Sequence, residues 1–451
     1  MRKKVVIILC LCLMAVVCAA ALQVLRAVNP TLVIRAGLLI DGTGDPVQTN
    51  VHIFIRGASI QKIRPVSQGG VPLFARRIDA RNRTIIPGLI DSHVHFVDEV
   101  FCGQFLEFGV TSVRDMGNNT DFILELRDRI NAGRRSGPTI FASGYLINNR
   151  RIPFGASRYT AVVNTPEEAR RAVEVLARRG VDWIKVYFTL PPLLTRTVIQ
   201  AAKSHGLPVA GHIRRVDARQ AVRWGMKTIE HTTGIAEALL NQDEFKDAPP
   251  LWTISNRAWL HTDRSRYDDL INLLVQNGVG ITANLTLYRS MASTADELKA
   301  KHDHPESLMP IFYLDGWVNY LKGRFLELTA DRDSWIETEK KVKEFIRLFK
   351  DAGGTVLAGT DTPWPYLFPG YSLHEEIHLL VDAGFTPMEA LQAATGNAVK
   401  IFGEKADIGT VTPGKRADLV ILRDNPLADI HNTLSIVRVI KNGRPVPRKN
   451  K

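Results

Sequence analysis

Short apolar runs alternate with amphipathic stretches along most of this chain. The runs have the composition of buried strands, and the stretches between them, such as 166–179 and 193–205, have the spacing of helices. This alternation continues over roughly 300 residues, which is the length and order of elements in a (β/α)8 barrel. Because that fold collects its chemistry at the carboxyl ends of its strands, the residues that end each run are the first candidates for a functional site.

The run 84–95, TIIPGLIDSHVH, is the most informative of these. Side chains at positions i and i+2 of a strand point to the same side, so His93 and His95 can both reach one point at the mouth of a barrel. Imidazole nitrogens are common metal ligands. A His-x-His pair alone is weak evidence, since two histidines at this spacing are more often structural or exposed.

Four later runs strengthen the metal hypothesis, because each ends in or encloses a residue that can take part in a metal site. Lys185 lies inside the apolar segment 183–187, whose composition indicates a buried strand and not an exposed edge. The other three are His212, His231 and Asp361, which close the segments 207–212, 227–231 and 354–361. The six candidates therefore fall on successive strand ends, where a barrel would bring them together.

The order His-x-His, Lys, His, His, Asp resembles the amidohydrolase superfamily of metal-dependent hydrolases, and the flanking words PGLIDSHVH, WIKVY, VAGH, TIEH and AGTDTP agree with it. The closest likeness is to the imidazolonepropionase-like branch, which includes binuclear-zinc Xaa-Pro dipeptidases. The likeness extends from about Thr31 to about Val446. It implies an α/β fold, namely a (β/α)8 TIM barrel with a small β-sandwich domain built from the N- and C-terminal segments.

The two ends of the chain fit this expectation. Residues 31–63 and 408–446 alternate apolar and polar positions, and Asn442-Gly443 is typical of a hairpin turn. Each piece alone is too small to bury a core, which favours one shared domain over two unrelated β extensions. The expected division is a signal peptide or membrane anchor at 1–22, the sandwich at 31–85 and 405–447, and the metal-binding barrel at 86–404.

The resemblance also implies two metal sites. Their ligands would be the side chains at the strand ends, with His93, His95 and Asp361 for the more buried ion and His212 and His231 for the second. Lys185 would bridge the two ions as a carbamate formed with carbon dioxide, because an ammonium group has no acceptor and would repel two cations. The expected cofactor is two divalent ions, with Zn2+ preferred, or one ion if Lys185 is unmodified.

In the implied mechanism a metal-activated hydroxide attacks the carbonyl carbon of an amide. Asp361 would take the proton from the attacking water and pass it to the leaving group, as general base and then as general acid. Tyr187 lies two residues beyond Lys185 and therefore points to the same side of the strand. Its hydroxyl would stabilise the oxyanion, or its ring would pack under the adjacent loop, and the sequence leaves both roles open.

Three further residues are candidates for substrate contact. Arg150 and Arg151 lie in the loop 144–160, and an arginine fork suits a carboxylate on the substrate, although loop arginines are often only solvated. Asn284 ends the apolar run 279–283 and is expected to face the substrate. Dipeptidases of this branch commonly carry a histidine in the matching loop and Gly-Gly after the lysine strand. This chain has neither, so its specificity is expected to differ from that for Xaa-Pro dipeptides.

The expected activity is hydrolysis of an amide bond in a small exported substrate, such as a peptide, an Xaa-Pro-like dipeptide or an N-acyl amino acid. The same site would suit a cyclic amide, a lactone or a phosphotriester, and the sequence barely separates these alternatives. Deaminases of the superfamily that this chain resembles place a proton-shuttling glutamate shortly after the third histidine. Deamination is disfavoured because no glutamate follows shortly after His212. A binding protein that has lost catalysis is disfavoured because Asp361 and the other ligand positions are all present.

The N-terminus has the features of an export signal. Residues 2–4 are basic, the run 5–22 is apolar, and the alanines at 19–21 offer a cleavage site. The run is also just long enough to span a bilayer, so an uncleaved anchor is the alternative. The expected location is periplasmic or extracellular, or on a membrane facing outward. Three of the four cysteines lie in this leader, which leaves Cys102 without an internal partner and predicts a small buried apolar residue.

Composition excludes other classes of function. A hydrophobic content of 45% and a charged content of 23% are typical of a globular protein. The net charge of +12 is spread over the leader, the C-terminal tail and helix faces, and no nucleic-acid-binding motif accompanies it. The expected partner is therefore a small-molecule or short-peptide substrate and not a nucleic acid. Membrane association would come through the N-terminal segment, and the sequence leaves oligomerisation open.

Overall fold

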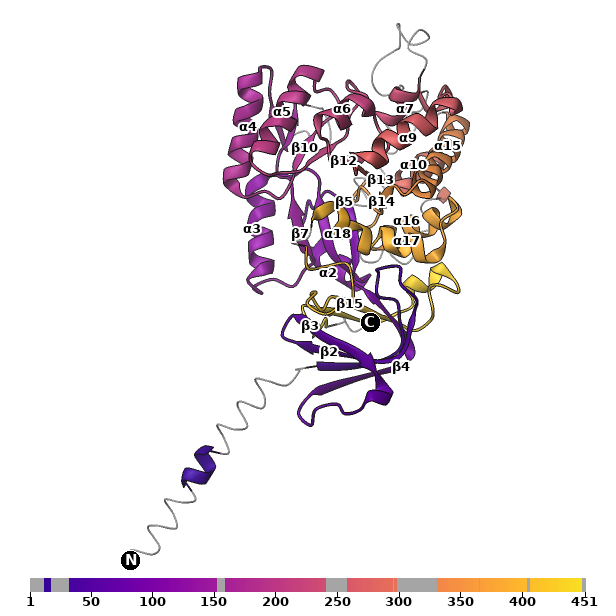
Figure 1. Ribbon diagram of the computed structural model, residues 1–451. Coiled ribbons are helices and arrows are strands. Elements are labelled where there is room, and N and C mark those ends of the chain that lie inside the picture. The colour runs from indigo at the N-terminus through magenta and orange to yellow at the C-terminus, as the bar shows by residue number, and fades with distance from the viewer. Residues whose placement is uncertain are drawn as a thin grey trace, which may run out of the picture.

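The computed structural model describes residues 12–17, 32–151, 159–240, 258–294, 296–297, 331–364, 366–403 and 406–447. These residues form an α/β fold in two parts (Figure 1). Helices surround short parallel strands in the larger part, and the indigo N-terminal strands lie with the yellow C-terminal strands in the smaller part. The predicted α/β class is confirmed.

Parallel strands form the centre of the larger part. One sheet has the order β5-β6-β7, and the other has the order β14-β13-β12-β11-β10-β8-β9. Their bounds are β5 Leu89–Val94, β6 Val110–Asp115, β7 Thr139–Ala142, β8 Leu146–Asn148, β9 Thr160–Val162, β10 Ile184–Val186, β11 Val209–Gly211, β12 Thr228–Glu230, β13 Gly280–Thr282 and β14 Thr355–Leu357. Strands β5, β6 and β10 to β13 are buried along their whole length, so the polar and charged residues within them need partners inside the fold.

Helices follow the strands along the chain. They are α2 Phe101–Glu107, α3 Thr120–Asn131, α4 Pro166–Arg179, α5 Pro192–Ser204, α6 Ala218–Trp224, α7 Ile235–Leu239, α9 Tyr267–Gln276, α10 Leu285–Ala292, α15 Arg332–Asp351, α16 Tyr371–Asp382, α17 Pro387–Ala393 and α18 Gly396–Phe402, with short 3-10 turns at Val66–Gln68, Arg264–Arg266 and Ile430–Leu434. The stretch predicted to be helical at 193–205 corresponds to α5, which begins and ends one residue earlier, and the stretch at 166–179 is α4. A capping box between Thr165 and Glu168 begins it, and Gly180 ends it in the left-handed conformation.

The two parallel sheets approach each other without a full ladder between them. Strands β7 and β8 are separated only by residues 143–145. At the other edges, Ser92 N donates to Ala358 O at 2.9 Å and Asp361 N donates to His93 O at 2.8 Å, beside one isolated parallel bridge. The predicted order of parallel strands is therefore present, but the described residues do not form one continuous closed ladder. Asp361 has a φ of 63°, which interrupts the extended backbone after β14.

The smaller part is a seven-stranded sheet made from both ends of the chain. Its order is β17-β16-β15-β4-β1-β2-β3, with bounds β1 Leu32–Leu39, β2 Gln48–Arg56, β3 Ser59–Pro65, β4 Arg76–Pro87, β15 Leu419–Leu422, β16 Ile436–Lys441 and β17 Arg444–Pro445. The sheet curls, since Ile60 N reaches Lys415 O at 2.9 Å, and apolar side chains of β1, β2, β4 and β15 enclose a core of their own. The terminal segments share a sheet, as expected. The strands form one continuous curled sheet, and the sandwich arrangement stays a prediction.

Strand β4 leads directly into the strand that carries the paired histidines. Only Gly88 separates β4 from β5. A Cβ atom at Gly88 would collide with the side chain of Thr111 in β6, so this close approach requires glycine. Strand β4 runs through residues 85 and 86 without a break and ends at Pro87. The smaller sheet therefore fixes the position at which β5 begins. The domain limits given above stay predictions.

The predicted leader lies mostly outside the described residues. Residues 12–17 are helical and exposed. Within the described ranges, no helix combines the length and the apolar character that crossing a membrane requires. Cys102 is buried in α2 and unpaired, as expected, and burial raises the pKa of its thiol.

Candidate metal centre

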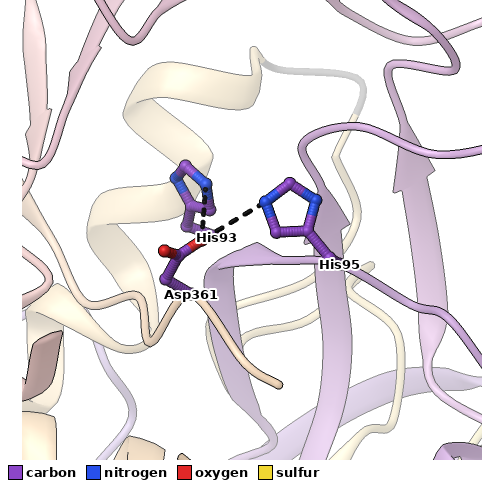
Figure 2. A group of neighbouring side chains, drawn as sticks. All are labelled: His93, His95 and Asp361. Atoms are coloured by element: carbon purple, nitrogen blue, oxygen red, sulfur yellow. Dashed lines mark ion pairs between the residues drawn. The ribbon is translucent and has the colours of Figure 1, made fainter. Parts of the chain in front are cut away.

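Two histidines and one aspartate meet where β5 and β14 end. His93 lies in β5, His95 lies just beyond it, and Asp361 follows β14. The Nε2 atom of each histidine is 3.3 Å from Asp361 Oδ1 (Figure 2). The three ligand atoms lie within 4.8 Å of one another, and among the described residues this is the one group so arranged. These three residues are called the first corner below.

Hydrogen bonds through Nδ1 orient both histidines of the first corner. His93 Nδ1 lies 2.7 Å from Glu230 Oε2, and His95 Nδ1 lies 2.9 Å from Gly117 O. An imidazole that donates through Nδ1 presents its Nε2 lone pair to a metal. Burial lowers the pKa of His93 well below its usual value, which keeps the ring neutral. Burial also lowers the pKa of His95, but the Asp361 carboxylate reverses this and raises it overall.

A buried arginine holds Glu230 in turn. Arg114, in β6, donates to the two carboxylate oxygens at 2.9 and 3.1 Å, and Thr228 Oγ1 donates to Oε1 at 2.6 Å. Arg114 and Glu230 are both fully buried. Burial raises the pKa of Glu230, but the charges of Arg114 and Lys185 outweigh this and hold it below its usual value. Glu230 is therefore an anion whose position sets that of His93.

A second buried carboxyl ties β5 to the segment that carries Asp361. Asp91 Oδ2 accepts from Thr360 Oγ1 at 2.7 Å. Its Oδ1 accepts from the backbone N–H of Thr360 at 3.1 Å and from that of His93 at 3.2 Å. Burial raises the pKa of Asp91 to about 7. These three bonds fix the two strand ends that supply the first corner relative to each other.

Lys185, His212 and His231 form a second group beside the first corner. They come from β10 and from the residues that follow β11 and β12. The ring centroid of His231 lies 4.4 Å from that of His93 and 4.9 Å from that of His212. Lys185 is 1% exposed, so its amine lies inside the fold. These three residues are called the second corner below.

Polar atoms of the second corner lack hydrogen-bond partners within the described part of the chain. They are Lys185 Nζ, His212 Nε2 and His231 Nδ1, and all three are buried. Burial lowers the pKa of both histidines well below the usual value and lowers the pKa of Lys185 to about 8. Buried polar atoms are nearly always paired, so three unpaired nitrogens at one place indicate that a ligand completes the site. Together with the first corner, this set of nitrogen and oxygen donors fits divalent metal ions.

Three neighbouring strand ends hold strained backbone. His231, Asn284 and Asp361 follow β12, β13 and β14 with φ values of 56°, 50° and 63°. A non-glycine residue in this left-handed region costs about 1–3 kcal/mol, and such residues cluster at functional sites. Backbone bonds to the next strand hold two of them there, since His231 N donates to Thr282 O and Asp361 N donates to His93 O.

The residues predicted to contact substrate lie in different settings. Tyr187 packs edge-on against His212, with ring centroids 4.8 Å apart, and burial raises the pKa of its hydroxyl. Arg150 and Arg151 are exposed beyond β8, and the rest of their loop, 152–158, lies outside the described residues. Asn284 is fully buried after β13. The structure thus brings Tyr187 beside the second corner, whereas it shows no contact of the two arginines with the described residues of either corner.

Sequence reasoning missed the residues that support the first corner. Glu230 directly precedes His231, and Asp91 lies two residues before His93 in the same strand. Strand alternation could have placed Asp91 on the same face as His93. Arg114 lies inside a buried strand, where a charge needs a partner, and this was the available signal for an internal ion pair.

Comparisons with known proteins identify the family of this chain. The model of the amidohydrolase family matches residues 84–446. The ochratoxinase of Aspergillus niger is 23% identical over 481 residues, which cover 91% of this chain and 86% of that protein.

Solved structures show the same fold. One from Bifidobacterium longum, provisionally named a prolidase, is 25% identical, has a TM-score of 0.72, and covers 93% of this chain and 95% of its own. A Xaa-Pro dipeptidase with bound methionine has a TM-score of 0.68 at 23% identity, over 92% of this chain and 99% of its own. Because the family model matches well over half of the sequence, this protein belongs to the amidohydrolase family.

Proposed function

We propose that this protein is a metal-dependent hydrolase that cleaves an amide bond in a small substrate, such as a dipeptide or an N-acyl amino acid. One observation carries the proposal: the converging ligand atoms of the first corner lie beside the unpaired buried nitrogens of the second corner. Membership of the amidohydrolase family supports an amide as the scissile bond. Relatives named as an ochratoxinase and a Xaa-Pro dipeptidase support a small substrate.

The proposed metal ligands divide by corner. The first corner would hold the more buried ion, and His212 and His231 would hold the other. Lys185, converted to a carbamate, would give one oxygen to each ion and would offset their charge, whereas unmodified Lys185 would leave a single-metal site. Zinc suits such a set of nitrogen and oxygen ligands. We also propose that the parallel strands form one (β/α)8 barrel around this centre, which the backbone bonds between β5 and the segment after β14 support.

Residues of the chain have separate roles in the proposed hydrolysis. Divalent ions, when bound, act as Lewis acids and lower the pKa of water enough to give a nucleophile at neutral pH. Asp361 accepts the proton of that water on its carboxylate and donates it to the leaving nitrogen. Tyr187 keeps its proton, because burial raises its pKa, and donates to the carbonyl oxygen as negative charge develops there. Phe188, whose ring lies 5.4 Å from that of His212, excludes water from this side.

We propose further that the protein is exported and acts on a substrate outside the cytoplasm. The basic and apolar segments at 2–22 and the alanines at 19–21 support a cleaved signal, with an uncleaved anchor as the other form. N-terminal sequencing of the protein from the secreted and membrane fractions decides between them. An intact Met1 in the soluble cytoplasmic fraction would contradict export.

Metal analysis tests the centre. The purified protein is expected to hold two divalent ions per chain, His93→Ala is expected to lose the first, and Lys185→Ala is expected to lose the second. One ion per chain in the wild type, unchanged in Lys185→Ala, would contradict the bridging carbamate and leave a single-metal hydrolase.

A hydrolysis screen tests the activity. The metal-loaded protein is expected to cleave members of a panel of dipeptides and N-acyl amino acids, to lose activity on chelation and to regain it with Zn2+. Turnover of lactones or phosphotriesters without amide cleavage would contradict the substrate class. Activity of the metal-free protein would contradict the mechanism.

A further inference from the structure

Asn284 is a buried amide without a hydrogen-bond partner. It lies between β13 and α10 and is 0% exposed. Neither its Oδ1 nor its Nδ2 atom has a partner among the residues that the structure describes. Its backbone is in the left-handed region, with φ of 50° and ψ of 44°. A group that is buried, unpaired and strained is unfavourable for folding alone, which points to a use in binding.

A neighbouring carboxyl performs the capping role that asparagine usually has. Asparagine at the start of a helix normally accepts a hydrogen bond from the first turn. Here Glu376, in α16, accepts the N–H of Leu285 at 3.0 Å with Oε1 and that of Thr286 at 2.8 Å with Oε2. The side chain of Asn284 makes no cap bond. Glu376 therefore anchors α10 and leaves both polar atoms of the Asn284 amide available to a ligand.

Asn284 follows β13, which lies between the two strands that lead to His231 and Asp361. Thr282 points inward, since its Oγ1 accepts from the buried arginine of β6 at 3.0 Å, and Ala283 packs in the main apolar core. Asn284 follows two residues beyond Thr282, where the chain turns from β13 into α10 in the left-handed conformation. The adjacent strand ends carry His231 and Asp361. Asn284 is thus flanked by residues of both corners of the metal centre.

We propose that Asn284 binds the secondary amide of a dipeptide-like substrate, with Oδ1 accepting the N–H of that amide and Nδ2 donating to an oxygen of the carboxylate that follows it. This inference rests on the proposed function, because it sets amide recognition beside the metal centre. An unpaired acceptor and an unpaired donor on one side chain require a ligand that offers both. A dipeptide with a secondary amide offers an N–H and, next to it, carboxylate oxygens, whereas the bond in an Xaa-Pro dipeptide has no N–H and a lactone or phosphotriester offers acceptors only. The preferred substrate is therefore an amide whose scissile nitrogen carries a hydrogen.

The test compares three dipeptides on the metal-loaded enzyme: Ala-Leu, Ala-(N-methyl)Leu and Ala-Pro. The wild type is expected to prefer Ala-Leu by about 10- to 100-fold in kcat/KM, because the other two leave Oδ1 unpaired. Asn284→Ala is expected to lower kcat/KM for Ala-Leu and to change that for the other two by less than about threefold, so the preference collapses. Asn277→Ala, at the exposed end of α9, is the matched control and is expected to keep the wild-type preference.

A second variant separates lost recognition from a folding defect. Asn284→Gly removes the unpaired amide and accepts the φ of 50°, so its Tm is expected to be no lower than that of the wild type. An unchanged preference in Asn284→Ala, or an equal loss on all three dipeptides, would overturn the assignment.

Failure of the proposed function would give a different result from failure of the Asn284 assignment. If the metal-loaded protein cleaves none of the three dipeptides, the hydrolase proposal fails, and equilibrium binding of Ala-Leu and Ala-(N-methyl)Leu still decides the role of Asn284. Tighter binding of Ala-Leu that depends on Asn284 supports the assignment. Equal Kd values for the two dipeptides, or no binding of either, overturn it.

Discussion

The two corners of the candidate metal centre differ in how far the chain itself satisfies their polar atoms. In the first corner, His93 and His95 both bond through Nδ1, and Glu230 behind His93 has its own arginine. In the second corner, buried nitrogens of Lys185 and both histidines have no partner among the described residues. The first corner is thus organised by the chain itself, whereas the second leaves polar atoms for which we propose a metal ligand. Stability and metal binding should therefore respond differently to changes in each corner.

Breaking the support of the first corner is expected to have the largest effect. Glu230→Gln removes the charge that pairs with fully buried Arg114 and weakens the bond to His93 Nδ1. Loss of a buried ionic partner costs about 3–5 kcal/mol of folding free energy, and loss of a carboxylate behind a metal-binding histidine lowers metal affinity roughly 10- to 100-fold. Chemical denaturation and metal titration measure the two effects. Glu167→Gln, on the exposed face of α4, is the control, and an unchanged Glu230→Gln would show that the ion pair does not support this corner.

Replacing Asp361, the proposed proton acceptor of the first corner, should affect catalysis more than folding. Asp361→Asn keeps the size of the side chain but removes the acceptor for the proton of water. It is expected to lower kcat by about 1000-fold, within the range for loss of a general base. The measurement is kcat on the best amide of the screen at saturating metal, with exposed Asp268→Asn as the control. Retention of more than a tenth of the activity would exclude Asp361 as the general base.

The second corner should respond in the opposite way. Lys185→Met removes a buried amine that has no described partner and keeps an unbranched side chain of similar length. The metal-free variant is expected to be as stable as the wild type or about 1–2 kcal/mol more stable, because relief of the buried amine from desolvation outweighs the loss of its attraction to Glu230, and no hydrogen bond is lost. It is also expected to bind one ion and to gain less Tm than the wild type when metal is added. A large loss of stability without metal would mean that Lys185 has a structural partner and would remove the contrast between the corners.

The smallest effect is expected outside both corners. Arg150→Ala or Arg151→Ala removes an exposed charge near the loop after β8. If that charge attracts a substrate carboxylate, KM should rise by about two- to fivefold while kcat stays nearly constant, since such a contact exists before the transition state. Steady-state kinetics on a dipeptide and on its C-terminal amide separate the cases, with exposed Arg134→Ala as the control. An equal rise in KM for the amide would exclude a contact with the carboxylate.

Local patterns predicted the α/β class and the order of the parallel strands, and the roles of the candidate site residues stay predictions. The paired histidines, Lys185 and the later candidates were identified because buried parallel strands are rich in apolar residues. A polar residue within or just after such a run is therefore conspicuous. Helix α4 was bounded correctly by its capping box and Gly180. The curl of the terminal sheet was not predicted, since strand alternation reports which side is buried and carries no information about how a sheet bends.

The sequence by itself determined the family and the α/β class and placed the candidate residues in or just after successive strands, because these depend on residue type and on spacing along a few neighbouring positions. Tertiary structure decided which of those residues share partners. Glu230 reaches His93 across 137 positions, Asp91 reaches Thr360 across 269, and Glu376 replaces the cap of a helix that begins 91 positions earlier. Such pairings arise only when distant strands and helices come together. Their physical reason is that a buried polar group must find a partner wherever the fold brings one within hydrogen-bond distance.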